Sequence, residues 1–227
     1  MTTVSRQLPL QWPHAASFAR EDFLAAPENV EALRLIESWP KWPSPTLLLI
    51  GPKGSGKSHL GAIWAAQVQA RETRGDALRG ADLVSLASGP ALLIDDVDRV
   101  GSAEAELFHL LNLLKEHAVG ALMTASSPPD AWGLRTADLL SRLRLAPIAR
   151  LGAPEPDLLR AVLFKLFSDR QLVVEPPVVN YLAMRLERSL DAARAIVEAL
   201  DREALARGKA VTRALAAELL RDDIDTP

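Results

Sequence analysis

The chain of 227 residues contains no cysteine, and this absence excludes several kinds of chemistry. Without thiols the protein forms no disulfide, holds no thiolate zinc site and uses no cysteine nucleophile. No apolar run is long enough to span a membrane, and the N-terminus lacks the apolar core of a signal peptide. A cytoplasmic protein with no membrane partner is therefore expected.

An excess of positive charge is also missing. Lysine and arginine number 26 against 29 aspartate and glutamate residues, which gives a formal net charge of −3. This balance does not suggest a strongly basic surface for nucleic acid. Hydrophobic residues make up 48% of the chain, enough to bury a sizeable core. The length suits one domain with a small appendage.

The most informative stretch is Gly51–Ser58, which has the spacing G-x-x-x-x-G-K-[ST]. It lies between an expected buried strand, residues 47–50, and an expected helix, residues 60–66, as this motif requires. Glycines let several backbone N–H groups approach a triphosphate. Lys57 would place a cation on the outer phosphates, and the Ser58 hydroxyl would ligate Mg²⁺. The alternative is a glycine-rich turn before a helix. The predicted nucleotide-binding residues here are Gly51, Pro52, Lys53, Gly54, Ser55, Gly56, Lys57, Ser58 and His59.

A second apolar run, residues 91–94, ends in two acids, Asp95 and Asp96. Ligands of parallel sheets collect at the carboxyl ends of the strands. Asp95 is expected to hold Mg²⁺ through water, and Asp96 is expected to orient or activate the attacking water. The alternative is an acidic turn after a strand.

Further along the chain, residues 121–124 are expected to form a third strand with a polar end. A side chain there could contact the γ-phosphate or the attacking water, although a serine–proline turn is the alternative. A short helix, residues 138–144, precedes another strand, residues 146–151. Arg142 on that helix could serve a nucleotide in a neighbouring subunit, or it could be a solvated arginine.

The remaining pattern divides the chain into three parts. These are a leader, residues 1–17, an α/β domain, residues 18–153, and a helical domain, residues 154–227. Residues 72–89 are ambiguous, and residues 81–87 could be a short strand or a helical turn. The helix that contains residues 60–66 is expected to continue to about residue 71, and the other helices are expected at about 28–39, 104–118, 156–169, 176–187, 189–207 and 211–222. In the leader, Gln7–Leu10 could dock in an apolar groove on a partner, or could be unstructured.

Taken together, these motifs resemble those of the AAA+ ATPases and, more narrowly, of the DnaA-like group. The resemblance covers about residues 5–222. It is carried by Gly51–Leu60, Ile94–Asp96, Ser126–Pro129 and Leu139–Leu143, with Phe23 and Asn29 before the core. Gln7–Leu10 and the end of the chain at Pro227 make it similar to the Hda subgroup, the regulatory inactivators of the replication initiator DnaA.

The resemblance implies an AAA+ P-loop NTPase core with a parallel five-stranded sheet flanked by helices, followed by a small all-α lid. It implies bound ADP or ATP with Mg²⁺, held in part by Ser58 and Asp95. Ser126 falls at the sensor I position, with Thr124 as a second candidate. Arg142 matches the arginine finger, which in this subgroup acts on ATP held by DnaA. The remaining assignments are Phe23, Pro27 and Asn29 around the adenine and ribose, and Gln7, Leu8, Pro9 and Leu10 as the peptide that binds the β sliding clamp of DNA polymerase III.

Two departures from the family pattern affect these expectations. Asp191 falls where the sensor II arginine is expected, and Arg188 or Arg194, one turn to either side, could substitute. Such a change would fit a preference for ADP. Residues 72–89 are shorter than usual between the two nucleotide motifs.

Three functions follow from the resemblance. The first is a DnaA-directed adaptor, with possible self-association and without a domain for direct binding of double-stranded DNA. The second is a helicase-loader-type ATPase that uses Asp95 and Asp96 on its own ATP. The third is a non-enzymatic scaffold that binds nucleotide for stability.

Overall fold

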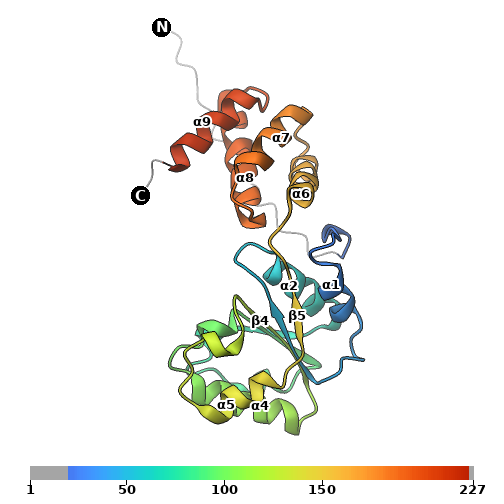
Figure 1. The fold of residues 1–227 in the computed structure, drawn as a ribbon, viewed down its shortest axis with the longest axis vertical. Helices are drawn as coiled ribbons and strands as arrows, with labels where there is room; N and C mark the ends of the chain where they lie inside the picture. The colour runs from blue at the N-terminus through green and yellow to red at the C-terminus, as the bar shows by residue number, and fades with distance from the viewer. Residues whose placement is uncertain (1–19, 225–227) are drawn as a thin grey trace. The chain divides into compact units, whose positions relative to one another are not determined.

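The computed structural model describes residues 20–224 and the side chains of residues 20–221. The chain divides at Glu155 into two compact units, an α/β unit up to Glu155 and a helical unit from Pro156 onward (Figure 1). Gln7, Leu8, Pro9 and Leu10, predicted to bind the clamp, lie outside the described residues.

The α/β unit is built on one sheet of five parallel strands in the order β2-β3-β4-β1-β5. The strands are β1 (Thr46–Ile50), β2 (Arg71–Arg74), β3 (Ala91–Asp95), β4 (Gly120–Ala125) and β5 (Ile148–Arg150). The predicted parallel five-stranded sheet is therefore confirmed. Because Ile50 pairs with Ala125 and Arg74 with Asp95, the carboxyl ends of the strands meet at one edge.

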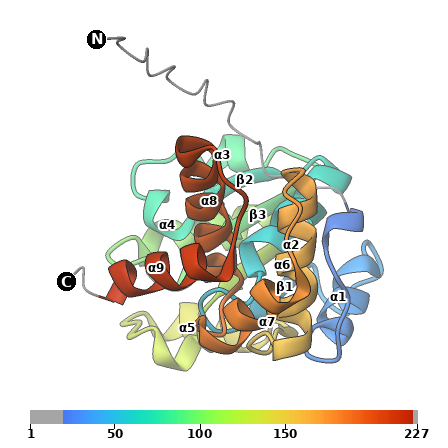
Figure 2. The same cartoon turned by 90° about the horizontal axis from the view of Figure 1, so that it is seen from above.

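Side chains of the central strands alternate between two buried faces. In β1, Leu47 and Leu49 pack on one face, and Leu48 and Ile50 pack on the other. The first face is covered by α1 (Val30–Glu37) and α2 (Lys57–Val68), and the second by α3 (Leu83–Leu86), α4 (Glu104–Glu116) and α5 (Ala137–Arg144). Figure 2 shows α1 at one margin of the unit and α4 and α5 toward the other. Burial on both faces explains why these strands are continuous apolar runs.

The ambiguous stretch after α2 forms an edge strand and short helical turns. Helix α2 ends at Val68, because Gln69 adopts a left-handed conformation with φ 56°, so the expected continuation to residue 71 is wrong. The chain then forms β2, the 3₁₀ turn η2 (Gly75–Ala77) and α3. Residues 81–87 thus contain a helical turn rather than a strand. Further 3₁₀ turns are η1 (Arg20–Asp22), η3 (Val97–Arg99) and η4 (Pro129–Ala131).

The helical unit contains α6 (Pro156–Asp169), α7 (Pro176–Arg185), α8 (Leu190–Arg207) and α9 (Arg213–Ile224). Local signals set the ends of these helices. Prolines begin α7, the Ser189 hydroxyl caps α8 by accepting from the Ala192 N–H, and Gly208 ends α8 with φ 60°. Leu163, Val179 and Leu200 pack in its core. Among residues 20–224, no helix has the length and apolar character needed to cross a membrane.

Candidate nucleotide site and arginine rim

The loop between β1 and α2 has the backbone that a phosphate cradle requires. Gly54 and Gly56 adopt left-handed conformations with φ 71° and 93°. Such angles favour glycine because it has no Cβ. At Gly51, an added Cβ would lie 2.7 Å from the Leu151 carbonyl oxygen, so a larger residue would displace the backbone. The predicted glycines are therefore required by the shape of this loop.

A cation and a hydroxyl are buried under the same loop. Lys57 is only 6% exposed, and its Nζ donates a 2.9 Å hydrogen bond to the Pro52 carbonyl. The Ser55 hydroxyl is buried and has no hydrogen-bond partner among the described residues. Pro52 and Lys53 are exposed on the rim of the loop. An open backbone cradle, a buried cation and an unpaired hydroxyl fit a polyphosphate.

The predicted magnesium ligands lie together at the carboxyl edge of the sheet. The Ser58 hydroxyl donates to Asp95 Oδ1 at 3.1 Å, and Thr124 Oγ1 donates to the same oxygen at 2.5 Å. Oxygen ligands of this kind suit Mg²⁺, which usually takes one or two carboxylates together with phosphate and water. Within the described part of the chain, no group of three or more acidic or histidine side chains could hold a metal by itself. The donor set therefore fits Mg²⁺ that is bound together with a nucleotide.

The second acid of this pair, Asp96, is engaged by arginine. It has a left-handed backbone, φ 48°, and its Oδ2 accepts a 3.1 Å hydrogen bond from Arg74 Nη2. Arg99 Nη1 lies 3.9 Å from the same oxygen. Arg74 also donates to Asp76 at 3.2 Å, and its guanidinium holds the pKa of the Asp76 carboxyl below its ordinary value. Asp96 is thus tied to the end of the neighbouring strand, by an arginine that the sequence did not single out.

The two sensor I candidates have different surroundings. Thr124 is fully buried, and besides Asp95 it contacts the backbone N–H of Asp96, which donates to Thr124 Oγ1 at 2.9 Å. Ser126 is exposed, and its backbone N–H donates to Asp98 Oδ2 at 2.7 Å. Thr124, the second candidate, is therefore the residue that bridges both acids, and a phosphate contact by Ser126 stays a prediction.

The residues expected around adenine lie in the segment before α1. Phe23 is buried and stacks on His59, with ring centroids 6.2 Å apart. Asn29 is also buried, accepts from the Ala26 N–H at 2.8 Å and donates to the Leu24 carbonyl at 2.9 Å. Both polar ends of Asn29 thus hold the local backbone. Pro27, between them in sequence, is exposed.

Arg142, the expected arginine finger, is held against α4. Its Nη1 donates to Asn112 Oδ1, and its guanidinium carbon lies 5.0 Å from the centre of the Phe108 ring. In the described residues, no carboxylate forms an ion pair with Arg142. Two positions along the helix, Arg144 Nε donates to Asp130 Oδ1 at 2.9 Å and holds the pKa of Asp130 below its ordinary value. Neither Asn112 nor Phe108 could be singled out from the sequence.

Glu104 fixes the segment that leads into α5. Its carboxylate accepts from the backbone N–H of Arg135 at 3.0 Å and of Thr136 at 2.8 Å. These hydrogen bonds to the charged form lower the pKa of Glu104. Glu104 therefore connects the start of α4 to the residue before α5.

The expected sensor II candidates belong to the helical unit. Arg188 is exposed in the loop before α8, and Arg194 Nη1 lies 3.9 Å from Asp191 Oδ1 in the first turns of α8. A phosphate contact by Arg188 or Arg194 stays a prediction.

Comparisons of sequence find relatives among replication initiator proteins. No protein-family model matches the chain. The chromosomal replication initiator protein DnaA of Campylobacter jejuni is 28% identical over 136 residues, which cover 59% of this chain and 31% of that protein. The matched stretch thus spans about a third of the relative's length.

Comparisons of structure agree with the sequence relatives. Domain III of DnaA from Thermotoga maritima superposes with a TM-score of 0.77 at 21% identity, over 95% of this chain and all of that one. AMPPCP-bound DnaA from Aquifex aeolicus gives 0.75 at 14% identity, over 93% of this chain and 71% of that one. The RuvB Holliday junction branch migration motor of Thermotoga maritima gives 0.65 at 20% identity, over 84% and 66% of the two chains. In sequence and in fold, this chain is thus similar to DnaA proteins.

Proposed function

We propose that this protein is an Hda-like negative regulator of replication initiation. In this proposal it is a nucleotide-bound AAA+ adaptor, tethered to the β sliding clamp of DNA polymerase III, that presents Arg142 to ATP held by DnaA. The observation that carries the proposal is the contrast between Arg142, which keeps an uncompensated charge among the described residues, and Asp96, which is tied to Arg74.

The bound nucleotide is ADP or ATP, and the phosphate loop would hold it through Lys57 and the backbone N–H groups of residues 51–58. Ser58 and Asp95 would hold Mg²⁺ at the carboxyl edge of the sheet. When bound, Mg²⁺ neutralises charge on the phosphate oxygens. The structures of DnaA with AMPPCP support an adenine nucleotide here.

Arg142 keeps the positive charge that an arginine finger needs when it acts on a nucleotide held by another molecule. An amide oxygen fixes the guanidinium without cancelling its charge, and the Phe108 ring supports it from one side. A carboxylate in the place of Asn112 would form an ion pair that phosphate must break. Asn112 and Phe108 are therefore positioning residues in this proposal.

The protein's own acids support a weak intrinsic activity. A residue that orients or activates water must have a free carboxylate oxygen directed at that water. Asp96 Oδ2 accepts from Arg74, with Arg99 also close to it, so only Oδ1 is left to contact a water. This arrangement favours action on a partner's nucleotide over turnover of the protein's own.

Tethering to the clamp rests on Gln7–Leu10, outside the described residues. Replacing Gln7 and Leu10 by alanine is expected to abolish clamp binding in a pull-down. Nucleotide affinity is expected to stay unchanged, because the peptide is not part of the phosphate-loop motif. Equal capture of the clamp by the double variant would remove this part of the proposal.

The proposal is tested by mixing the protein with DNA-loaded clamp and ATP-charged DnaA and measuring phosphate release. Arg142→Ala is expected to lower the stimulated rate by about 10³-fold, the low end of the effect of an arginine finger. The matched control is Arg144→Ala on the same helix, which is expected to keep most of the stimulation. Equal rates for wild type and Arg142→Ala would instead support the non-enzymatic scaffold.

A second candidate function, hydrolysis of the protein's own ATP as in helicase loaders, is favoured by the hydrogen bonds that join Ser58, Asp95 and Thr124. It predicts robust turnover by the isolated protein, which Asp95→Asn abolishes. A rate near that of uncatalysed hydrolysis would exclude it.

A further inference from the structure

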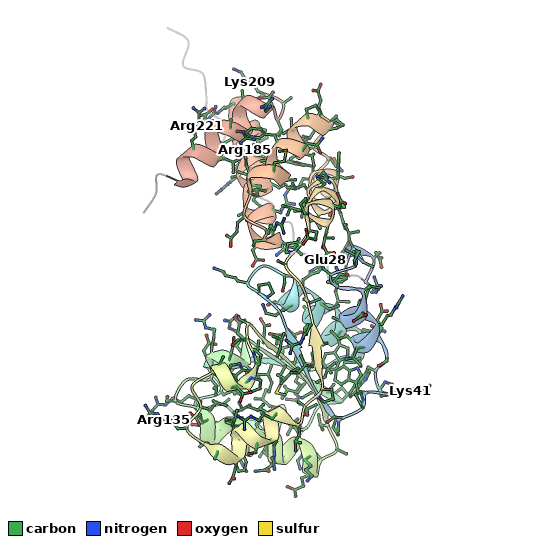
Figure 3. The ribbon with its side chains drawn as sticks, viewed as in Figure 1. Glu28, Lys41, Arg135, Arg185, Lys209 and Arg221 are labelled. Carbon is green, nitrogen blue, oxygen red and sulfur yellow. The ribbon has the colours of Figure 1, made fainter. Side chains whose placement is uncertain are left out.

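The helical unit contains a pocket that the proposed nucleotide chemistry does not use. Its volume is about 540 Å³, within the range of roughly 300–1,000 Å³ that ligand pockets occupy. Its walls come from the end of α7 and the loop after it, the start of α8 and the last turns of α9. Together with two alanines, the pocket is lined by Tyr181, Arg185, Leu186, Glu187, Leu220 and Arg221. Arg185 and Arg221 are labelled in Figure 3.

Tyr181 holds two guanidinium groups beside this pocket. The guanidinium carbon of Arg185 lies 4.1 Å from the centre of the Tyr181 ring, and that of Arg213, the first residue of α9, lies 4.9 Å from it. Stacking on a ring fixes a guanidinium but leaves its charge and its outward N–H groups available. The tyrosine therefore pre-organises arginines without neutralising them.

Most other arginines of the helical unit are already paired with acids. Arg207 binds Glu203 and Glu218, and Arg170 lies near Glu198 and Asp201. Arg185, Arg213 and Arg221 differ, because none of them forms an ion pair with a residue of the described chain. Arg221 Nε donates instead to the Ala217 carbonyl at 3.1 Å.

The composition of the walls selects the ligand. Two exposed arginines, Arg185 and Arg221, and one exposed acid, Glu187, give the walls a surplus of positive charge, and Leu186 and Leu220 supply an apolar surface. A carboxylate beside an apolar side chain satisfies both features. Glu187 can accept N–H groups of a peptide backbone, which a phosphodiester lacks. Tyr181, the one aromatic among the described lining residues, is engaged with arginine rather than available to stack on a base.

We propose that this pocket binds an acidic, apolar peptide segment of a partner protein. A carboxylate of the segment pairs with Arg185 and Arg221, and a neighbouring leucine or isoleucine packs on Leu186 and Leu220. Backbone N–H groups of the segment donate to Glu187. This proposal stands apart from the nucleotide site and from Arg142, so it holds whether or not the protein acts on DnaA.

The test uses fluorescence anisotropy with the full chain. The probe is a fluorescein-labelled, capped peptide of eight residues in which leucine and glutamate alternate, and the control peptide has glutamine in place of glutamate. Wild type is expected to bind the glutamate peptide at least tenfold more tightly than the glutamine peptide, with the difference decreasing as salt rises. The double variant Arg185→Gln with Arg221→Gln is expected to lose at least tenfold in affinity for the glutamate peptide.

The matched control is Arg202→Gln, an exposed arginine of α8 outside the pocket lining, which is expected to bind as wild type does. If the double variant unfolds by circular dichroism, Leu220→Ser replaces it, with the same expected tenfold loss. Equal affinity for both peptides, or no binding of the glutamate peptide to wild type, would overturn the proposal. Binding of a labelled oligothymidylate that the arginine variant abolishes would also overturn it, in favour of a nucleic-acid site.

Discussion

Two regions of the α/β unit treat their charges in opposite ways. At the carboxyl edge of the sheet, Asp96 is tied to Arg74 by a hydrogen bond between opposite charges. At the α5 rim, defined here as Arg142 with Asn112 and Phe108, the arginine is fixed by an amide and a ring. The difference teaches that the type of partner, carboxylate or amide, decides whether a fixed charge remains available to another molecule.

The same contrast occurs within one helix. Arg142 and Arg144 are two positions apart on α5, yet Arg144 forms an ion pair with Asp130, and Arg142 does not pair with any described acid. The pair provides variants on one helix in which side-chain length and charge are the same. Differences between their effects can therefore be assigned to the neighbours of each guanidinium.

The largest effect is expected at the nucleotide site itself. Lys57→Ala should lower ADP affinity by about 100-fold or more, because it removes the buried cation below the loop. Titration calorimetry measures this change, and the loss of bound nucleotide should also lower the melting temperature measured with ADP. Lys53→Ala, an exposed lysine of the same loop, is the control and should change affinity little. Unchanged affinity in Lys57→Ala would argue against the phosphate-loop interpretation.

The next prediction tests whether Arg142 must be held by a neutral side chain, the Asn112 amide, to stimulate hydrolysis. Asn112→Asp should lower stimulated hydrolysis on DnaA by roughly 10–100-fold, because the new carboxylate pairs with Arg142 and competes with phosphate. Added salt should restore part of the activity by screening that pair. Phosphate release over a salt series is the readout.

The control for Asn112→Asp is a variant that removes an ion pair from the neighbouring Arg144. Asp130→Asn frees Arg144 from its ion pair and should leave stimulation near the wild-type value. If Asn112→Asp stimulates as well as wild type, the neutral amide has no role in the finger.

A smaller effect, on intrinsic ATP hydrolysis, is expected when Asp96 loses its hydrogen bond from Arg74. Arg74→Ala should raise the intrinsic hydrolysis of the isolated protein by several-fold, on the order of tenfold at most, because Asp96 loses its 3.1 Å partner. Single-turnover hydrolysis of radiolabelled ATP measures the rate. Arg71→Ala, at the other end of β2, contacts Ser85 and serves as the control. A rate that does not rise would show that Arg74 does not restrain Asp96.

The smallest effect concerns stability in acid. The pKa of Glu104 is lowered on folding, so its contribution to stability is complete above its ordinary value near 4.5 and is lost as pH falls through the lower folded value. Glu104→Gln should therefore destabilise by about 1 kcal/mol near neutral pH and by less in acid. Urea unfolding at pH 7 and pH 3 measures the two differences. A penalty that grows in acid would contradict the assignment.

The elements predicted correctly from sequence are the central strands, which short apolar runs determine. Strands β1, β3 and β4 are apolar because both faces of the sheet are covered. Phosphate binding by Gly51–Ser58 and the roles of Asp95 and Asp96 stay predictions. Strand β2 was missed because Arg71–Arg74 is a polar edge strand without apolar alternation. Because this strand was not predicted, Arg74 was not recognised as a residue near the nucleotide site.

The partners that distinguish the two regions depend on tertiary contacts. Asn112 reaches Arg142 across 30 positions of sequence, and Thr124 reaches Asp95 across 29. Neither residue type nor spacing marks such pairs. Thr124 also contacts the backbone N–H of Asp96, and the sensor I role predicted for Ser126, with Thr124 as the second candidate, stays a prediction.

The most direct measurement asks whose ATP is hydrolysed. DnaA is charged with radiolabelled ATP, this protein is loaded with unlabelled nucleotide, and release of labelled phosphate is followed with DNA-loaded clamp present. The account predicts that Arg142→Ala abolishes this release and that Asp96→Asn of the present chain leaves it unchanged. Labelled phosphate that persists with Arg142→Ala, or that disappears with Asp96→Asn, would contradict it.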